Sequence, residues 1–279
     1  MHDDRTPADQ PEHDPWAGLT APEEPAVAIS IGNTTARLGL IRGFAVASTR
    51  AVPAADAEAV AAATAELAAA AEAPTALVAS VNTSASSKLV DRLRAAGGPA
   101  PLPFGPAMPV PMPTDVPEPQ SVGQDRLLAA LGAFHALKQA CIVVDAGTAL
   151  TVDFIDGHGV FQGGAIAPGA QLMLDALRDH TDALPGTSLA DMPEPLEPYA
   201  KSTEHAMLLG VRGAVRGAIR YLAEQYAEHY EAYPSIIATG GDAEALLRGD
   251  ELIDTIAPDL LLLGIAVARA RLAHEPDQA

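Results

Sequence analysis

Residues 26–35 read AVAISIGNTT, and residues 140–149 read ACIVVDAGTA. Each stretch is an apolar run that ends in a glycine turn with threonine beside it, which predicts a buried strand followed by a tight turn. Backbone N–H groups and hydroxyls at such a turn can wrap a phosphate. The repeat therefore predicts two related domains that face each other across a nucleotide cleft. The two copies differ where the second has Asp145 and the first has Ser30.

Composition and charge narrow the class of protein. The 279 residues are 48% apolar, which is enough for a large core in one or two domains. The formal net charge of −19 argues against a nucleic-acid partner, which needs a basic surface. An anionic substrate would need a metal ion, an arginine or oriented N–H groups to offset this field locally.

Cysteine usage and the N-terminal region bear on location. The one cysteine, Cys141, cannot form an intramolecular disulfide, which fits a reducing compartment. No apolar run reaches the length of a membrane span, and the N-terminus lacks a basic region followed by an apolar stretch. We therefore expect a cytoplasmic protein with no membrane partner. Residues 1–25 hold five prolines and seven acids against one arginine, which predicts a disordered acidic tail.

Hydrophobic runs separated by glycine and proline predict strands that alternate with helices. Residues 36–41 follow the first glycine turn as the hairpin partner of the strand at 27–31. Further strands are expected at 76–81, 149–155, 160–167 and 235–238, and helices at 54–72, 86–96, 123–139, 168–180, 203–230 and 259–273, with a short one from Asp242. This alternation indicates an α/β fold.

Two segments have more than one interpretation. Residues 99–119 contain nine prolines, which predicts no regular element there, and the segment fits a surface linker or a substrate-site loop. The charged pair Asp125 and Arg126 opens the helix that follows this segment. A charged pair placed directly after a rigid segment favours the substrate-site loop over the surface linker. In the long helix at 203–230, the glycines at 210, 213 and 217 lower helix propensity, so we expect them to permit close packing. That packing is equally well intramolecular or between two copies of the chain.

Six motifs occur in one order along the chain. They are SIGNT at 30–34, GQDR at 123–126, DAGTALT at 145–151 with Asp153 after it, GGAIAPG at 163–169, TDALP at 181–185 and TGG at 239–241. Together, over about residues 26–270, they resemble the type III pantothenate kinases of bacteria, part of the actin-like, sugar-kinase-like ATPases. The resemblance implies two ribonuclease-H-like domains, residues 26–135 and 136–279, with a nucleotide cleft between them.

The resemblance also implies an activity and a homodimer. The activity is the ATP-dependent phosphorylation of pantothenate to 4'-phosphopantothenate, the first step of coenzyme A biosynthesis, with Mg²⁺ and a monovalent cation, K⁺ or NH₄⁺. In this family pattern Asp125 is the general base, Asp145 lies near the monovalent cation, and the remaining site residues fall into two groups. Pantothenate would contact Gly123, Gln124, Arg126 and Thr181, the last often from the partner subunit, and ATP would contact Ser30, Gly32, Asn33, Thr34, Gly147, Thr148, Gly240 and Gly241.

Each motif also has a purely structural interpretation. Asp125 and Arg126 fit an ordinary ion pair on a solvated helix turn, Asp145 fits a turn cap, Thr181 fits a polar residue at a helix end, and the glycines fit plain turns. The chain has no Gly-x₄-Gly-Lys-Ser/Thr loop, which excludes the P-loop kinases.

Ser30 departs from the family pattern, in which an acid begins the first motif and helps to hold magnesium. A hydroxyl is a poorer magnesium ligand than a carboxylate, and no Asp or Glu occurs between residues 26 and 55. We therefore expect an enzyme with reduced activity. The alternatives are a catalytically impaired paralogue that acts as a binding or regulatory protein, and a related small-molecule kinase.

Overall fold

The computed structural model describes residues 18–81, 83–192 and 197–274, and most of the expected acidic tail lies outside them. Residues 18–25 form no helix or strand but lie against the fold. There Leu19 packs on the core, and the carbonyl of Glu24 accepts a 2.6 Å hydrogen bond from Arg269 Nη1. Among the described residues, no helix is both long and apolar enough to cross a membrane.

Two five-stranded sheets have the same topology. In the first, β1 (Ala26–Ile31) is central, antiparallel to β2 (Thr35–Arg42), which pairs with β3 (Ala45–Pro53), and parallel to β4 (Thr75–Ser80), which pairs with β5 (Ala100–Pro103). In the second, β6 (Cys141–Ala146), β7 (Ala149–Ile155), β8 (Phe161–Pro168), β9 (Ser235–Thr239) and β10 (Thr255–Ile256) repeat this order. The predicted duplication and α/β class are confirmed.

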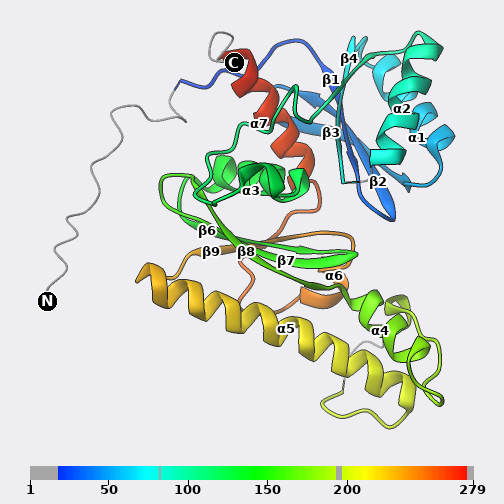
Figure 1. Ribbon diagram of the computed structural model, residues 1–279, viewed down its shortest axis with the longest axis vertical. Coiled ribbons are helices and arrows are strands. Elements are labelled where there is room, and N and C mark those ends of the chain that lie inside the picture. The colour runs from blue at the N-terminus through cyan, green and yellow to red at the C-terminus, as the bar shows by residue number, and fades with distance from the viewer. Residues whose placement is uncertain (1–17, 82, 193–196, 275–279) are drawn as a thin grey trace, which may run out of the picture.

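Helices cover both faces of each sheet (Figure 1). α1 (Ala57–Ala69) and α2 (Thr83–Ala96) pack on the outer face of the first sheet. α3 (Gln124–Leu137) and α7 (Leu260–His274) lie between the sheets, and α4 (Ala170–Asp179), α5 (Thr203–Tyr230) and α6 (Ala243–Leu247) pack on the far face of the second sheet. Two short 3₁₀ turns complete the elements, at Pro119–Ser121 and Leu189–Asp191. Because β1 and β6 are covered on both faces, each begins with four apolar residues in a row, and the polar residues Ser30 and Asp145 come only near the strand ends.

The helices α3 and α7 cross at two glycines. A Cβ on Gly132 would lie 2.6 Å from the carbonyl oxygen of Leu260, and one on Gly264 would lie 2.0 Å from that of Leu128. Both distances are far inside a normal contact, so only glycine permits the helices to approach this closely. The crossing anchors α3, whose first turn carries the GQDR motif.

The proline-rich segment forms a strand, which corrects the expectation of no regular element there. β5 pairs in parallel with β4 at the edge of the first sheet. The N–H groups of Ala100 and Phe104 donate to the carbonyls of Pro74 and Val78 at 2.7 and 2.8 Å. Successive backbone nitrogens of a strand point to opposite sides. The nitrogens of Pro101 and Pro103, which carry no hydrogen, therefore face the open edge of the sheet, where no donor is needed.

The glycines of α5 do not make the close intramolecular packing that was one of their two expected roles. Gly210, Gly213 and Gly217 are exposed, and an added Cβ at each would meet no atom within 4 Å. The helix is held instead by its opposite face, where Val215 and Ile219 are buried against the second sheet. These glycines therefore do not serve contacts within the described part of this chain.

Candidate active site

The two glycine turns, at Gly32 after β1 and at Gly147 after β6, meet in space. The hydroxyl of Thr34, after β1, lies 3.1 Å from the hydroxyl of Thr148, after β6, although the residues are 114 positions apart. Each turn is closed by its glycine, since Gly32 N–H donates to the Thr35 carbonyl and Gly147 N–H to the Ala149 carbonyl, both at 3.0 Å. The ends of the two central strands thus face each other from different sheets.

A third glycine turn joins this cluster from β9. Gly240 has φ +99°, and a Cβ there would lie 2.2 Å from the carbonyl oxygen of Ala146 and 2.5 Å from Asp145 Oδ1. The N–H of Asp242 donates to the same Ala146 carbonyl at 2.9 Å. Glycine is therefore required at 240 both for its backbone conformation and for the close approach of the two strand ends.

The GGAIAPG motif closes the cluster from β8. The N–H of Gly169 donates to the carbonyl of Thr148 at 3.1 Å, and a Cβ on Gly169 would lie 2.0 Å from the carbonyl oxygen of Gly147. This segment therefore packs its backbone directly on the Gly147–Thr148 turn.

Asp145 is the half-buried acid at the centre of these turns. Burial is the main cause that raises its pKa to about 7, and the neighbouring carboxylates Asp125, Asp153 and Asp242 raise it further. Asp125 therefore lies close enough to Asp145 for their charges to interact. A carboxylate in such surroundings is stabilised by a cation or by hydrogen-bond donors.

The carboxylate of Asp145 and the hydroxyl beside it are oxygen ligands of the kind that a cation binds. Thr239 pairs with Asp145 in the parallel register of β6 and β9, is 1% exposed, and its hydroxyl has no hydrogen-bond partner. Within the described ranges, no group of three or more His, Cys, Asp and Glu side chains is arranged to hold a metal. A cation here would therefore need further ligands, which is usual for Mg²⁺ held by one or two carboxylates and a nucleotide's phosphates.

The GQDR motif forms the first turn of α3. Gly123 is the N-cap residue and offers no side-chain cap, and Asp125 Oδ1 accepts a 2.9 Å hydrogen bond from the backbone N–H of Arg126. A Cβ on Gly123 would lie 2.5 Å from Asp125 Oδ1, so glycine leaves room for this carboxylate. The Oε1 atom of Gln124 is buried without a hydrogen-bond partner.

Arg126 does not pair with Asp125 on a solvated turn, which corrects that structural interpretation. Its Nε lies 3.1 Å from both carboxylate oxygens of Asp153 on β7, and its Nη2 also donates to Asp153 Oδ1. The two side chains are 15% and 1% exposed. Burial alone would lower the pKa of Arg126, but the hydrogen bonds and charge of Asp153 raise it overall.

Asp153 is the residue that the sequence did not place in the site. Burial raises its pKa, and Arg126 opposes that shift. The available signal was its position: Asp153 lies two residues after Thr151, which pairs with Asp145, so both side chains lie on one face of the sheet. Its arginine partner could not be read from β7 alone.

Thr181 lies apart from this cluster within the chain. It follows α4, which packs with α5 on the face of the second sheet opposite α3. Its hydroxyl donates to the carbonyl of Leu177 at 2.7 Å and is exposed. The structure therefore brings together the glycine turns, Asp125, Arg126 and Asp145, but gives Thr181 only local contacts.

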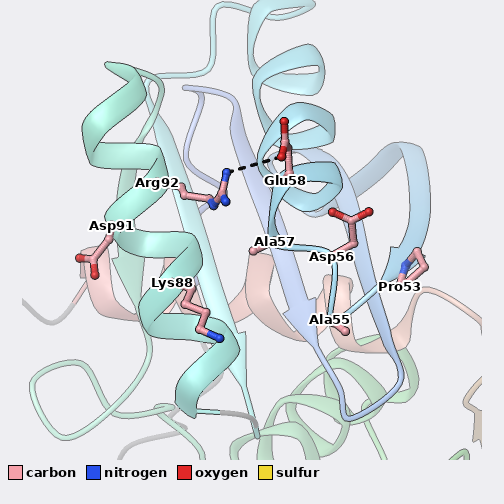
Figure 2. Close-up of a pocket in the computed structure, with 8 residues that line it drawn as sticks. All are labelled: Pro53, Ala55, Asp56, Ala57, Glu58, Lys88, Asp91 and Arg92. Atoms are coloured by element: carbon pink, nitrogen blue, oxygen red, sulfur yellow. Dashed lines mark ion pairs between the residues drawn. The ribbon is translucent and has the colours of Figure 1, made fainter.

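A hollow of about 770 Å³ lies elsewhere, on the outer side of the first sheet. Figure 2 shows the side chains that line it. It lies between the start of α1 and α2, and Arg92 approaches Glu58 to 4.0 Å across it. Asp56 caps α1 by accepting a 2.9 Å bond from the N–H of Ala59. The hollow contains none of the glycine turns and is separate from the candidate site.

The sequence model of the type III pantothenate kinase family matches residues 26–225. The chain belongs to the type III pantothenate kinase family. A type III pantothenate kinase from Akkermansia muciniphila is 38% identical over 158 residues, which are 55% of this chain and 62% of that protein. The match thus spans less than two thirds of the length of this curated relative.

Solved structures establish the fold of this family member. A Baf family protein from Campylobacter jejuni, described as a transcriptional activator, superposes with a TM-score of 0.58 at 18% identity, covering 90% of this chain and 98% of that one. MreB 5 of Spiroplasma citri, solved with AMPPNP, gives a TM-score of 0.50 at 14% identity, over 89% and 96% of the two chains. At these identities the likeness concerns the fold alone, and it confirms the predicted actin-like architecture.

Proposed function

We propose that this chain phosphorylates pantothenate with ATP to give 4'-phosphopantothenate, the first step of coenzyme A biosynthesis. The observation that carries the proposal is the meeting of the β1, β6 and β9 turns around Asp145, with the carboxylate of Asp125 in electrostatic range. The name shared by the matching family and relatives supports the choice of substrate.

The proposed mechanism depends on positioning and charge, as phosphoryl transfer generally does. The turns at 32–34 and 147–148 hold the phosphates of ATP through the hydroxyls of Thr34 and Thr148 and the backbone N–H groups that follow each glycine, because the N–H groups of Gly32 and Gly147 themselves close the turns. Gly240 and Gly241 let the nucleotide approach the backbone. Asp125 accepts the proton of the primary hydroxyl of pantothenate. Gly123, Gln124 and Arg126 line the substrate side. Magnesium bound with ATP would neutralise part of the negative charge of the phosphates.

We propose that Ser30 lowers the activity without abolishing it. Ser30 lies at the end of β1, directly opposite Arg37 on β2 in the antiparallel register. The Nε of Arg37 donates to Asp259 Oδ1 at 2.7 Å, so this guanidinium is paired with an acid from the other half of the chain. With a hydroxyl at position 30, Asp145 is the carboxylate that remains at the ends of the two central strands, β1 and β6.

The remaining parts of the proposal are a monovalent cation, a homodimer and a cytoplasmic location. Asp145 and the unpartnered hydroxyl of Thr239 support a K⁺ or NH₄⁺ site. The exposed glycines of α5 support close packing with a second copy of the helix, since their open face serves no contact within the described chain. In such a dimer, Thr181 of one copy would reach the pantothenate pocket of the other.

The test is ADP formation with pantothenate, Mg²⁺ and ATP, with and without K⁺. We expect measurable turnover by the native chain, a gain in Ser30→Asp and a loss of about 100-fold or more in Asp125→Asn, because a general base contributes about that much. Turnover that survives Asp125→Asn unchanged would remove the assigned base. ATP-analogue binding without pantothenate-dependent turnover would instead favour the non-catalytic paralogue, and turnover with another alcohol a related kinase.

A further inference from the structure

Asp153 is a buried carboxylate to which the proposed reaction assigns no step. It lies in the middle of β7, opposite Val143 on β6 and Gly164 on β8. Val143 belongs to the apolar cluster around α3, so this face of the sheet is the one that α3 covers. An acid that is 1% exposed in such a place is retained only with a strong partner.

The partner is the residue that follows the proposed base. Arg126 gives Asp153 its Nε, 3.1 Å from both oxygens, and its Nη2. The backbone N–H of the same Arg126 donates to Asp125 Oδ1 at 2.9 Å. Arg126 therefore connects the sheet to the carboxylate of Asp125 through one side chain and one peptide group.

The surroundings of the pair complete a built site. Thr151 lies on the same face of β7 as Asp153, and its side chain opposes the rise in the pKa of that acid. The guanidinium carbon of Arg126 lies 5.4 Å from the ring centroid of Phe161, and a Cβ on Gly164 would come within 2.3 Å of Asp153 Oδ1. The second glycine of the GGAIAPG motif thus leaves the space that the acid occupies.

The crossing with α7 restrains α3 from Leu128 onward, and the first turn before it has no side-chain cap. Its N-cap is Gly123, which makes no side-chain hydrogen bond to the helix. A turn with a side-chain cap would be oriented locally, whereas here the orientation depends on the buried pair with β7. A bidentate arginine–carboxylate pair specifies direction as well as distance.

We propose that Asp153 is a positioning residue for the phosphoryl transfer. It fixes the guanidinium of Arg126, and with it the first turn of α3, so that Asp125 faces the substrate alcohol. This inference rests on the proposed function, since it assigns the orientation of the proposed base. It differs from a purely structural role because it predicts an effect on kcat that exceeds any effect on nucleotide binding.

The test compares Asp153→Asn with the control Asp254→Asn. Asp254 lies just before β10, where its Oδ2 accepts a 2.7 Å bond from the N–H of Ile236, outside the site. We expect Asp153→Asn to lower kcat by about 10-fold or more while the KM for ATP and the affinity for a non-hydrolysable ATP analogue change by less than about twofold. The control should keep its kcat. An unchanged kcat in folded Asp153→Asn overturns the proposal.

A second variant and a second measurement keep the test decisive. Thr151→Val removes the hydroxyl that favours the ionised form of Asp153, with little change in volume, and we expect a loss in kcat of about threefold. If Asp153→Asn does not fold, an unchanged kcat in Thr151→Val overturns the proposal. Amide hydrogen exchange of residues 123–128 should become faster in Asp153→Asn and not in the control. This readout holds even if the native chain shows no turnover with pantothenate, which would refute the proposed function alone.

Discussion

The stability of the metal-free protein should depend on pH through Asp145, whose pKa is raised to about 7 by burial and by three neighbouring acids. An unfolded aspartate has a pKa near 3.9. Between about pH 4 and pH 7 the folded state therefore holds a proton that the unfolded state has released. Stability is full below the unfolded pKa and falls as pH rises through the folded pKa.

The size of the effect follows from the shift of about three pKa units. At about 1.4 kcal/mol per unit, ionised Asp145 costs the folded state about 4 kcal/mol above pH 7, of which about 2 kcal/mol is lost between pH 5.5 and pH 8. Asp145→Asn removes this titration and leaves the other carboxylates in place. The difference between the two proteins therefore isolates the contribution of Asp145.

The assay is urea unfolding of both proteins from about pH 5 to pH 8.5, at constant ionic strength, with chelator and without K⁺. We expect Asp145→Asn to be more stable than the native chain at pH 8, and the advantage to shrink as pH falls. A difference in unfolding free energy that stays constant over this range would refute the reasoning. Restoring K⁺ or Mg²⁺–ATP should stabilise the native chain more at pH 8 than at pH 5.5, because only the ionised carboxylate attracts a cation.

Two further predictions concern packing. Gly264→Ala places a Cβ 2.0 Å from the carbonyl oxygen of Leu128 at the α3–α7 crossing, so we expect the unfolding free energy to fall by about 3 kcal/mol. The control is Gly98→Ala, whose Cβ meets only an ordinary 3.9 Å contact. Equal stabilities of the two variants would mean that α3 and α7 can move apart at no cost. Gly213→Trp adds a bulky side chain to the open face of α5, and light scattering should show a folded monomer in place of a dimer. A dimer that tolerates tryptophan there would place the interface elsewhere.

Some elements could be predicted because their signals are local. The strand and turn at 26–35 combine an apolar run with glycine, and α5 was predicted with the bounds that the structure has. β3 was missed because its edge position leaves it mostly exposed, without a continuous apolar run. β5 was missed because nine prolines over 99–119 argue against any strand. Pro101 and Pro103 are compatible with a strand because they alternate along the open edge of the sheet. That edge is defined only by the pairing of β5 with β4 in the tertiary structure.

The amino-acid sequence alone determined the duplicated strand–turn units and the residues that end them, because each signal lies within about ten neighbours along the chain. Only the tertiary structure decided what those residues meet. Arg126 pairs with Asp153, which lies 27 residues further along the chain, and Thr34 contacts Thr148, which lies 114 residues further along. Thr239 lies beside Asp145 because β9 pairs in parallel with β6. Such partners are selected by the packing of sheets and helices, which brings together groups that no local pattern connects.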